Sequence, residues 1–144
     1  MCFGAKNEQF GKFYVPKSGK LAAIKLVHLY GYVSCFATVT SYWSYWGCGD
    51  NTWHDLNVKV NVVITTSANR MLLPPNQFIT HSAKWSKIPG YNSLSPELIL
   101  SVFSDPHQVN SSQELRLWYG EDLMDWTDTN NGGRVCCDVY ALYV

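Results

Sequence analysis

The chain has 144 residues, of which 47% are hydrophobic and 15% charged, and its formal net charge at pH 7 is zero. A chain of this length can bury a continuous core, so we expect residues 1–144 to form one domain. The balanced charge argues against a nucleic-acid-binding protein, and no apolar run approaches the roughly 20 residues that span a bilayer.

Strand patterns dominate the first half of the chain. Before residue 40 we predict three strands, over residues 10–15, 21–29 and 32–39, with Gly31 interrupting the pattern between the last two. The clearest alternation runs over residues 57–66, where valine and isoleucine occupy every second position and polar residues lie between them. This alternation predicts a half-buried strand of an antiparallel sheet.

Turn signals and three further strands fill the second half. Prolines break the chain near residues 74–75 and 88–96, and residues 97–103 are predicted as a strand rather than the helical turn that Ser95-Pro96 would start. Two long strands, over residues 114–119 and 134–143, are joined by an acidic loop. Short strands, polar turns and the lack of a convincing helix predict an all-β fold, an antiparallel β-sandwich of the jelly-roll type.

The five cysteines, an odd number, include no C-x-x-C pair, which argues against a structural zinc site. Cys35 and Cys48 bracket twelve residues and are suited to a disulfide that closes a loop. Cys136 and Cys137 are adjacent on a predicted strand and point to opposite faces, so one can pair while the other packs as a small apolar residue. Free, buried thiols in a reduced protein remain the alternative, and the sequence leaves the pairing, including that of Cys2, open.

The loop between the last two predicted strands is acidic. Four of the eleven acidic residues fall within eight positions: Glu121, Asp122, Asp125 and Asp128. Crowded carboxylates repel one another, so folding must hydrate them, pair them with cations or give them a metal. With Asn130 they offer the oxygen ligands that calcium prefers, although the last glutamate of an EF-hand loop is missing. We therefore predict a calcium site here, with a solvated turn as the alternative.

A second cluster is aromatic, with five aromatic residues between positions 42 and 53. Exposed tryptophan and tyrosine stack on the apolar faces of sugar rings, and neighbouring Asp and Asn side chains hydrogen-bond to hydroxyl groups. The alternative is that several of these rings pack in the core. The residues expected to contact a sugar, including those of the acidic loop, are Trp43, Tyr45, Trp46, Asp50, Asn51, Trp118, Tyr119 and Trp126.

Catalytic motifs are missing: there is no nucleophile elbow, no H-E-x-x-H, no phosphate-binding glycine loop and no dinucleotide fingerprint. We therefore expect a protein without catalytic activity. A carboxylate pair such as Glu121 with Asp125 would suit a glycan hydrolase, but any acidic cluster offers such a pair. A second alternative is a structural module that self-associates as a homo-oligomer through exposed sheet edges and aromatic residues.

Several segments resemble small secreted domains of corals, sea anemones and related marine invertebrates. They are residues 10–16, 23–28, 115–123, 128–133 and 135–143, so that the resemblance covers most of the chain. It implies a lectin-like or defence role and carries over no binding residues. The sequon at Asn110 also suits an extracellular domain, although no signal-peptide segment follows Met1. We expect a secreted, carbohydrate-binding, lectin-like module, assisted by calcium, with a glycan or glycoprotein as its partner.

Overall fold

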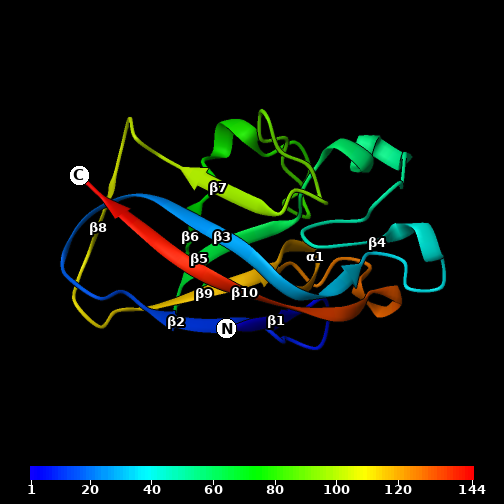
Figure 1. Ribbon diagram of the computed structural model, residues 1–144, viewed down its shortest axis with the longest axis horizontal. Coiled ribbons are helices and arrows are strands. Elements are labelled where there is room, and N and C mark those ends of the chain that lie inside the picture. Colours follow the sequence, from blue (N-terminus) through cyan, green and yellow to red (C-terminus); the bar gives the residue numbers. More distant parts are fainter.

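A computed structural model describes all 144 residues as two antiparallel β-sheets packed against each other (Figure 1). The six-stranded sheet contains β1 (Cys2–Gly4), β3 (Gly19–Ser34), β4 (Trp43–Ser44), β7 (Glu97–Ser101), β8 (His107–Val109) and β10 (Gly132–Tyr143). The four-stranded sheet contains β2 (Gly11–Tyr14), β5 (Val62–Thr66), β6 (Met71–Leu73) and β9 (Glu114–Tyr119). The prediction of an all-β sandwich is confirmed.

Helical structure is confined to short turns. One α-helical turn, α1 (Gly120–Leu123), follows β9 within the acidic loop, where the sequence indicated no helix. The 3-10 turns are Thr40–Tyr42, Trp53–Val58, Asn76–Phe78 and Asp128–Asn130. None of these helical segments has the length and apolar character required to cross a membrane.

The long strands β3 and β10 form the centre of the larger sheet and run side by side along the sandwich (Figure 1). The other edge of β3 pairs in succession with β8, β7 and β4. Gly31 does not interrupt β3, contrary to our expectation. It takes a left-handed φ of 90° directly opposite β10, where a Cβ would collide with the Arg134 carbonyl oxygen. A single strand therefore spans residues 19–34.

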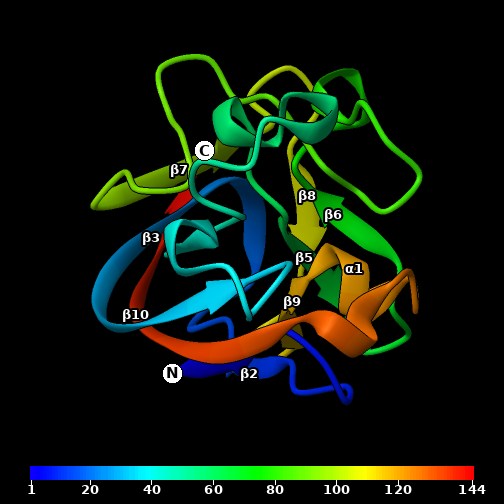
Figure 2. The same ribbon diagram turned by 90° about the vertical axis from the view of Figure 1, so that its right-hand side faces the viewer.

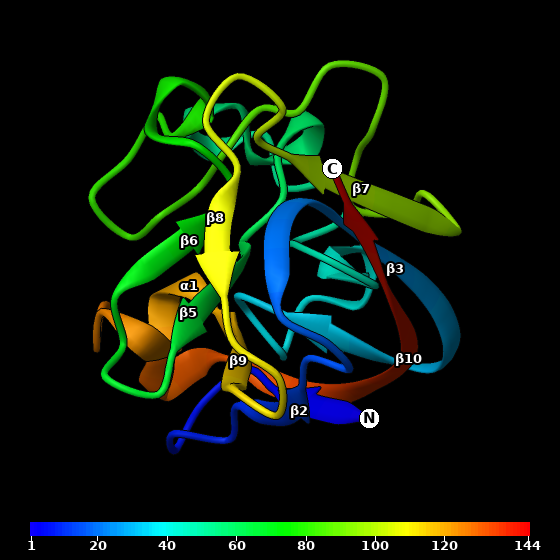
Figure 3. The ribbon, with the colours of Figure 1, turned by 90° about the vertical axis from the view of Figure 1, so that its left-hand side faces the viewer.

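The inner faces of the two sheets form a core cluster of 27 buried residues, in which Trp46, Trp85 and Tyr119 are the largest side chains. The polar atoms of these rings are paired: Trp46 Nε1 donates to Ser95 O at 2.7 Å, and the Tyr119 hydroxyl donates to Gly47 O at 2.8 Å. At the far end of the sandwich, β8 lies beside β6 (Figure 3), and His107 Nε2 donates to Leu72 O at 2.9 Å. The bonds made by Tyr119 and His107 tie the two sheets together.

The strand predicted over residues 57–66 is wrong in its first half. Residues 53–58 form 3-10 turns, and β5 starts only at Val62. Within β5, Val62, Val63 and Ile64 are all buried, because the outer face of this sheet is covered as well as the inner one. Phe10 packs on Trp118, the partner of Val63 in β9, with ring centroids 4.7 Å apart. Burial on both faces removes the alternation that the sequence suggested.

Two disulfides link the chain. Cys35 bonds to Cys48, as the spacing indicated, and Cys2 bonds to Cys136 across the β1–β10 ladder. Cys137 points to the opposite face and is a buried free thiol, so the prediction of one paired and one packed cysteine is confirmed.

Candidate functional site

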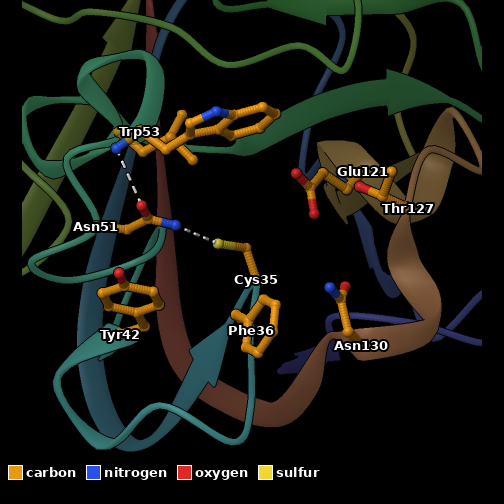
Figure 4. A pocket seen from close by; sticks show the side chains of 9 residues that line it. Cys35, Phe36, Tyr42, Asn51, Trp53, Glu121, Thr127 and Asn130 are labelled. Carbon is orange, nitrogen blue, oxygen red and sulfur yellow. Dashed lines mark hydrogen bonds between the residues drawn. The ribbon is translucent and has the colours of Figure 1, made fainter.

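Residues 35–58 and residues 120–131 meet at one end of the sandwich (Figure 2). A pocket of about 390 Å³ lies between them (Figure 4). Its walls come from two segments that are distant in sequence and that the β3–β10 pairing brings together. The residues that shape it are Phe36, Tyr42, Asn51, Trp53, Glu121 and Asn130. The pocket thus joins aromatic rings to a carboxylate and two amides.

The first wall is held by the Cys35–Cys48 disulfide. The side-chain nitrogen of Asn51 lies 3.4 and 3.6 Å from the two sulfur atoms, and its oxygen accepts from the Trp53 amide at 3.0 Å. Asn51 is therefore buried and fixed in place, while the ring of Trp53 remains 63% exposed at the mouth of the pocket. Phe36 is also exposed, directly after the disulfide (Figure 4). A rigid backbone here presents exposed aromatic faces.

The second wall contains the buried carboxylate of Glu121, whose side chain points into the pocket (Figure 4). Glu121 is only 5% exposed. Trp85 Nε1 donates to its Oε2 at 3.1 Å, whereas its Oε1 is buried without a partner. Burial raises the pKa of Glu121 to about 7; the hydrogen bond from Trp85 and the neighbouring side chain of Asn131 lower the pKa, and the charge of Asp128 raises it further. A buried carboxylate oxygen without a donor is destabilising until a ligand satisfies it.

The neighbouring carboxylate points elsewhere. Asp122 accepts hydrogen bonds from the backbone amides of Glu8 and Gln9, at 3.0 and 3.1 Å. Burial raises the pKa of Asp122 to about 6, the two amides lower it, and Asp128 raises it. Asp122 thus anchors the turn between β1 and β2, and its oxygens are already used by the fold.

Strained backbone borders the pocket on both sides. His54 and Asp55, after Trp53, have φ of 50° and 60°, and Asp125 and Thr127 have φ of 50° and 49°. Each left-handed residue other than glycine costs about 1 kcal/mol or more, and such residues concentrate at functional sites. The surrounding contacts therefore hold these two segments in shapes that they would not adopt alone.

The structure places the predicted sugar-contacting residues in several environments. Trp46, Trp118 and Tyr119 are buried in the packed interior, so their rings are not available to a ligand. This corrects our expectation, because composition does not distinguish rings on the covered faces of a sheet from exposed ones. Asn51 lines the pocket and Trp126 is exposed beside it, next to Thr127 of the lining.

The remaining three predicted contacts lie outside the pocket lining. Trp43 donates from Nε1 to Ala37 O at 3.1 Å and packs where Gly132 and Gly133 leave room for its indole. Tyr45 stacks on His28, with ring centroids 3.7 Å apart. Asp50 is exposed two residues after Cys48, outside the loop that the disulfide closes.

The predicted calcium ligands are only partly brought together. Glu121 and Asn130 line the pocket, and Asp125 is exposed. The charge of Asp128 raises the pKa of both Glu121 and Asp122. The structure contains no cluster of three or more His, Cys, Asp or Glu side chains with metal-binding geometry. Main-chain and amide oxygens are also hard ligands, however, and the pocket contains several.

The amide of Asn130 faces the carbonyl oxygens of Cys35 and Thr127. With its nitrogen toward them, it donates to Cys35 O at 3.2 Å and to Thr127 O. The amide and the two carbonyl oxygens therefore satisfy one another. The carboxylate of Glu121 is then the one anionic oxygen donor that the pocket lining offers to a cation.

Six lining residues were not among the predicted site residues: Cys35, Phe36, Tyr42, Trp53, Leu56 and Thr127. Phe36 and Thr127 carry no motif, and only the folded chain places them opposite each other. The one available signal was position, because Phe36 directly follows a cysteine of the predicted disulfide.

Asn61 connects this site to the core, and its removal tests how Glu121 is positioned. Its buried side chain donates to Ala83 O at 3.0 Å and accepts from the Glu121 amide at 2.9 Å. Asn61→Ala leaves both backbone groups unpaired, and we expect the free energy of unfolding to fall by about 3 kcal/mol. Urea denaturation measures this change. Asn57→Ala, at an exposed asparagine nearby, is expected to change it by less than about 0.5 kcal/mol, and an equal loss in both variants would contradict this role.

Comparisons with known proteins yield one match. No family model and no curated protein matches the chain. Among solved structures, AJLec from the sea anemone Anthopleura japonica is 35% identical in sequence, and the alignment covers 99% of this chain and 92% of AJLec with a TM-score of 0.84. The aligned region therefore includes both sheets and the segments from which the pocket is built.

Proposed function

This chain belongs to the family of the sea anemone lectin AJLec, and on that premise we propose that it binds carbohydrate in the pocket beside Glu121. The whole chain shares the fold of AJLec. The ligand class and the site are our inference.

The observation that carries this proposal is the unpaired, buried Oε1 of Glu121 inside an aromatic-walled pocket. A sugar hydroxyl or a cation bonded to sugar hydroxyls would satisfy this oxygen. Phe36 and Trp53 present ring faces at the mouth, and such faces pack against the C–H face of a sugar ring. A site with few polar groups among aromatic rings is the usual form of a small-molecule site.

Calcium is the second part of the proposal. The ion would be held by the unpaired Oε1 of Glu121, and Asp128 would contribute negative charge nearby. Bound calcium accepts six to eight oxygen ligands, so hydroxyl groups of a sugar can complete its coordination. The ion would also favour the charged form of Glu121, which burial otherwise disfavours.

Binding without catalysis is the reading that the lining supports. Glycoside hydrolysis usually requires two carboxyl groups on opposite sides of the bond that breaks. Glu121 is the one carboxylate in the lining, and the pocket offers aromatic and amide groups around it. Two disulfides are typical of an oxidising compartment, so we propose a secreted protein that binds glycans or glycoproteins.

Self-association is a second candidate function, supported by a separate surface. The outer face of β3 and β10 exposes Tyr30, Tyr140 and Leu142, each at least half exposed. Exposed apolar groups of this kind mark interaction surfaces. Sedimentation at several protein concentrations would detect assembly through this face, and a constant monomer mass would exclude it.

Calorimetric titration with calcium, followed by a glycan array with and without chelator, tests the proposal. We expect heat from calcium binding and glycan signals that disappear on chelation. Glu121→Gln should abolish both, whereas Glu97→Gln, at an exposed carboxylate paired with Lys25 at 3.6 Å, should preserve both. The absence of any glycan signal for the wild-type protein would refute sugar binding, and signals that persist in chelator would refute the role of calcium.

A further inference from the structure

Four aromatic rings form a continuous row at the edge of the pocket. Trp53 packs edge-on against His54 with ring centroids 4.1 Å apart, His54 lies 5.9 Å from His81, and His81 lies 5.6 Å from Trp126. The row is built from three segments that are distant in sequence, around residues 53, 81 and 126. Its assembly is therefore a product of the fold and not of one local motif.

The row begins and ends beside the pocket. Trp53 itself lines the pocket at one end (Figure 4), and Trp126 precedes Thr127, which lines the opposite wall. A ligand held by Glu121 that is longer than the pocket would extend over these rings.

The core does not require these rings. Trp53 is 63% and Trp126 43% exposed, and neither belongs to the core cluster. The left-handed residues on either side, His54 with Asp55 and Asp125 with Thr127, hold both indoles at the surface at a cost in backbone strain. Exposed indoles in a strained backbone favour a binding role over a packing role.

His81 adds a directed hydrogen-bond donor to the row. Its Nδ1 accepts from the Ala83 amide at 2.9 Å, so the proton of the neutral ring resides on Nε2. Burial, together with the nearby charges of His54 and Lys59, lowers the pKa of His81, which favours this neutral form. Nε2–H has no acceptor within the protein and is free to donate to a hydroxyl group.

We propose that Trp53, His54, His81 and Trp126 form a second subsite, which binds the further sugar units of an oligosaccharide whose terminal unit occupies the pocket. The indole faces would stack on successive sugar rings, and His81 Nε2–H would donate to a hydroxyl. The inference rests on the proposed function and narrows its ligand class from carbohydrate in general to oligosaccharides.

Calorimetry on the full chain with calcium present tests the subsite. The probes are methyl glycosides of galactose, mannose, fucose and N-acetylglucosamine, each compared with a tetrasaccharide that carries the same unit at its non-reducing end. We expect at least one tetrasaccharide to bind about tenfold more tightly than its methyl glycoside. Trp126→Ala and His81→Asn should each remove most of that gain and leave the affinity for the methyl glycoside within twofold.

The variants are matched to separate contact from folding. His81→Asn retains an acceptor for the Ala83 amide but lacks the distal donor, whereas His81→Gln can place a donor near the position of Nε2 and should restore part of the gain. Phe103→Ala removes an exposed aromatic ring outside the pocket lining and the row, and it should change neither affinity. Unchanged methyl glycoside binding shows that each variant is folded.

Three results would overturn the subsite. Equal affinities for tetrasaccharide and methyl glycoside would remove it while sugar binding in the pocket stands. A loss of both affinities in Trp126→Ala, with the unfolding temperature unchanged, would assign Trp126 to the pocket instead. No binding of any probe to the wild-type protein would refute the proposed function together with the subsite.

Discussion

Glu121→Gln is expected to make the calcium-free protein more stable at pH 8 by about 3 kcal/mol, although the same change removes ligand binding. The carboxyl group of Glu121 has a pKa of about 7 in the folded protein against an ordinary value of 4.5, because it is buried. A difference of this size corresponds to about 3 kcal/mol. Glutamine has nearly the same shape, can accept the hydrogen bond from Trp85, and carries no charge to desolvate.

The sign of the pH dependence follows from proton binding. Between pH 4.5 and 7 the folded protein holds the Glu121 proton more tightly than the unfolded chain does, so the contribution of this group to stability is complete below pH 4.5. That contribution decreases as the pH rises through 7 and is constant above it. The two proteins should therefore be equally stable near pH 4.5 and should diverge toward pH 8.

Urea denaturation in chelator from pH 4.5 to 8.5 measures this divergence. Asp122, whose pKa is also raised by burial, gives both proteins a residual slope, so the difference between them isolates Glu121. Glu97→Gln is the control, because it shows how the loss of an exposed carboxylate changes the free energy of unfolding. Parallel stability curves for wild type and Glu121→Gln would contradict the buried, unsatisfied state of this carboxyl group. Added calcium should stabilise the wild type at pH 8 and have no effect on Glu121→Gln.

We expect removal of either disulfide to lower stability, but only removal of Cys35–Cys48 to weaken ligand binding. Removing Cys2–Cys136, with a sequence separation of 134 residues, should lower the free energy of unfolding by about 5 kcal/mol. Removing Cys35–Cys48, separated by 13 residues, should lower it by about 3 kcal/mol. Only the second bond holds the pocket wall, because Asn51 contacts both of its sulfur atoms.

Double alanine variants test this separation. Chemical denaturation gives the two losses of stability, and calorimetry at low temperature gives the affinities for calcium and sugar. We expect Cys35→Ala with Cys48→Ala to bind at least tenfold more weakly, and Cys2→Ala with Cys136→Ala to bind as the wild type does. Equal binding by both double variants would show that the first wall does not depend on its disulfide.

The strands that could be predicted are those with one buried and one exposed face or with clear boundaries. The strand predictions over residues 21–29, 114–119 and 134–143 agree with the structure for this reason, whereas the strand predicted over residues 97–103 ends two residues earlier, at Ser101. The prediction over residues 57–66 failed at its start, since the left-handed backbone of His54 and Asp55 produces turns there that no side-chain pattern announces. In β5 itself the predicted alternation of buried and exposed residues is absent, because Phe10 packs on Trp118 and so covers the outer face of this sheet.

The residue types of the candidate site could be predicted from the sequence, but the individual residues that face the pocket could not. The segments with clustered carboxylates and clustered aromatic residues are the two that the fold brings together as the pocket walls. Which carboxylate faces the pocket depends on tertiary contacts: Asn61 and Trp85 position Glu121, whereas the amides of residues 8 and 9 take Asp122. The same holds for the rings, because burial of Trp118 and exposure of Trp126 are decided by distant parts of the chain.

The bond between Trp85 and Glu121 gives the protein a built-in optical reporter. The indole of Trp85 is shielded from solvent, and its N–H is joined to the carboxylate on which the pocket depends. Its ultraviolet emission should therefore shift when that carboxylate gains a proton or a cation, without any attached dye. The chain has six tryptophans. Replacing Trp85 with phenylalanine should abolish the emission shift and thereby assign it to Trp85 and to binding in the pocket.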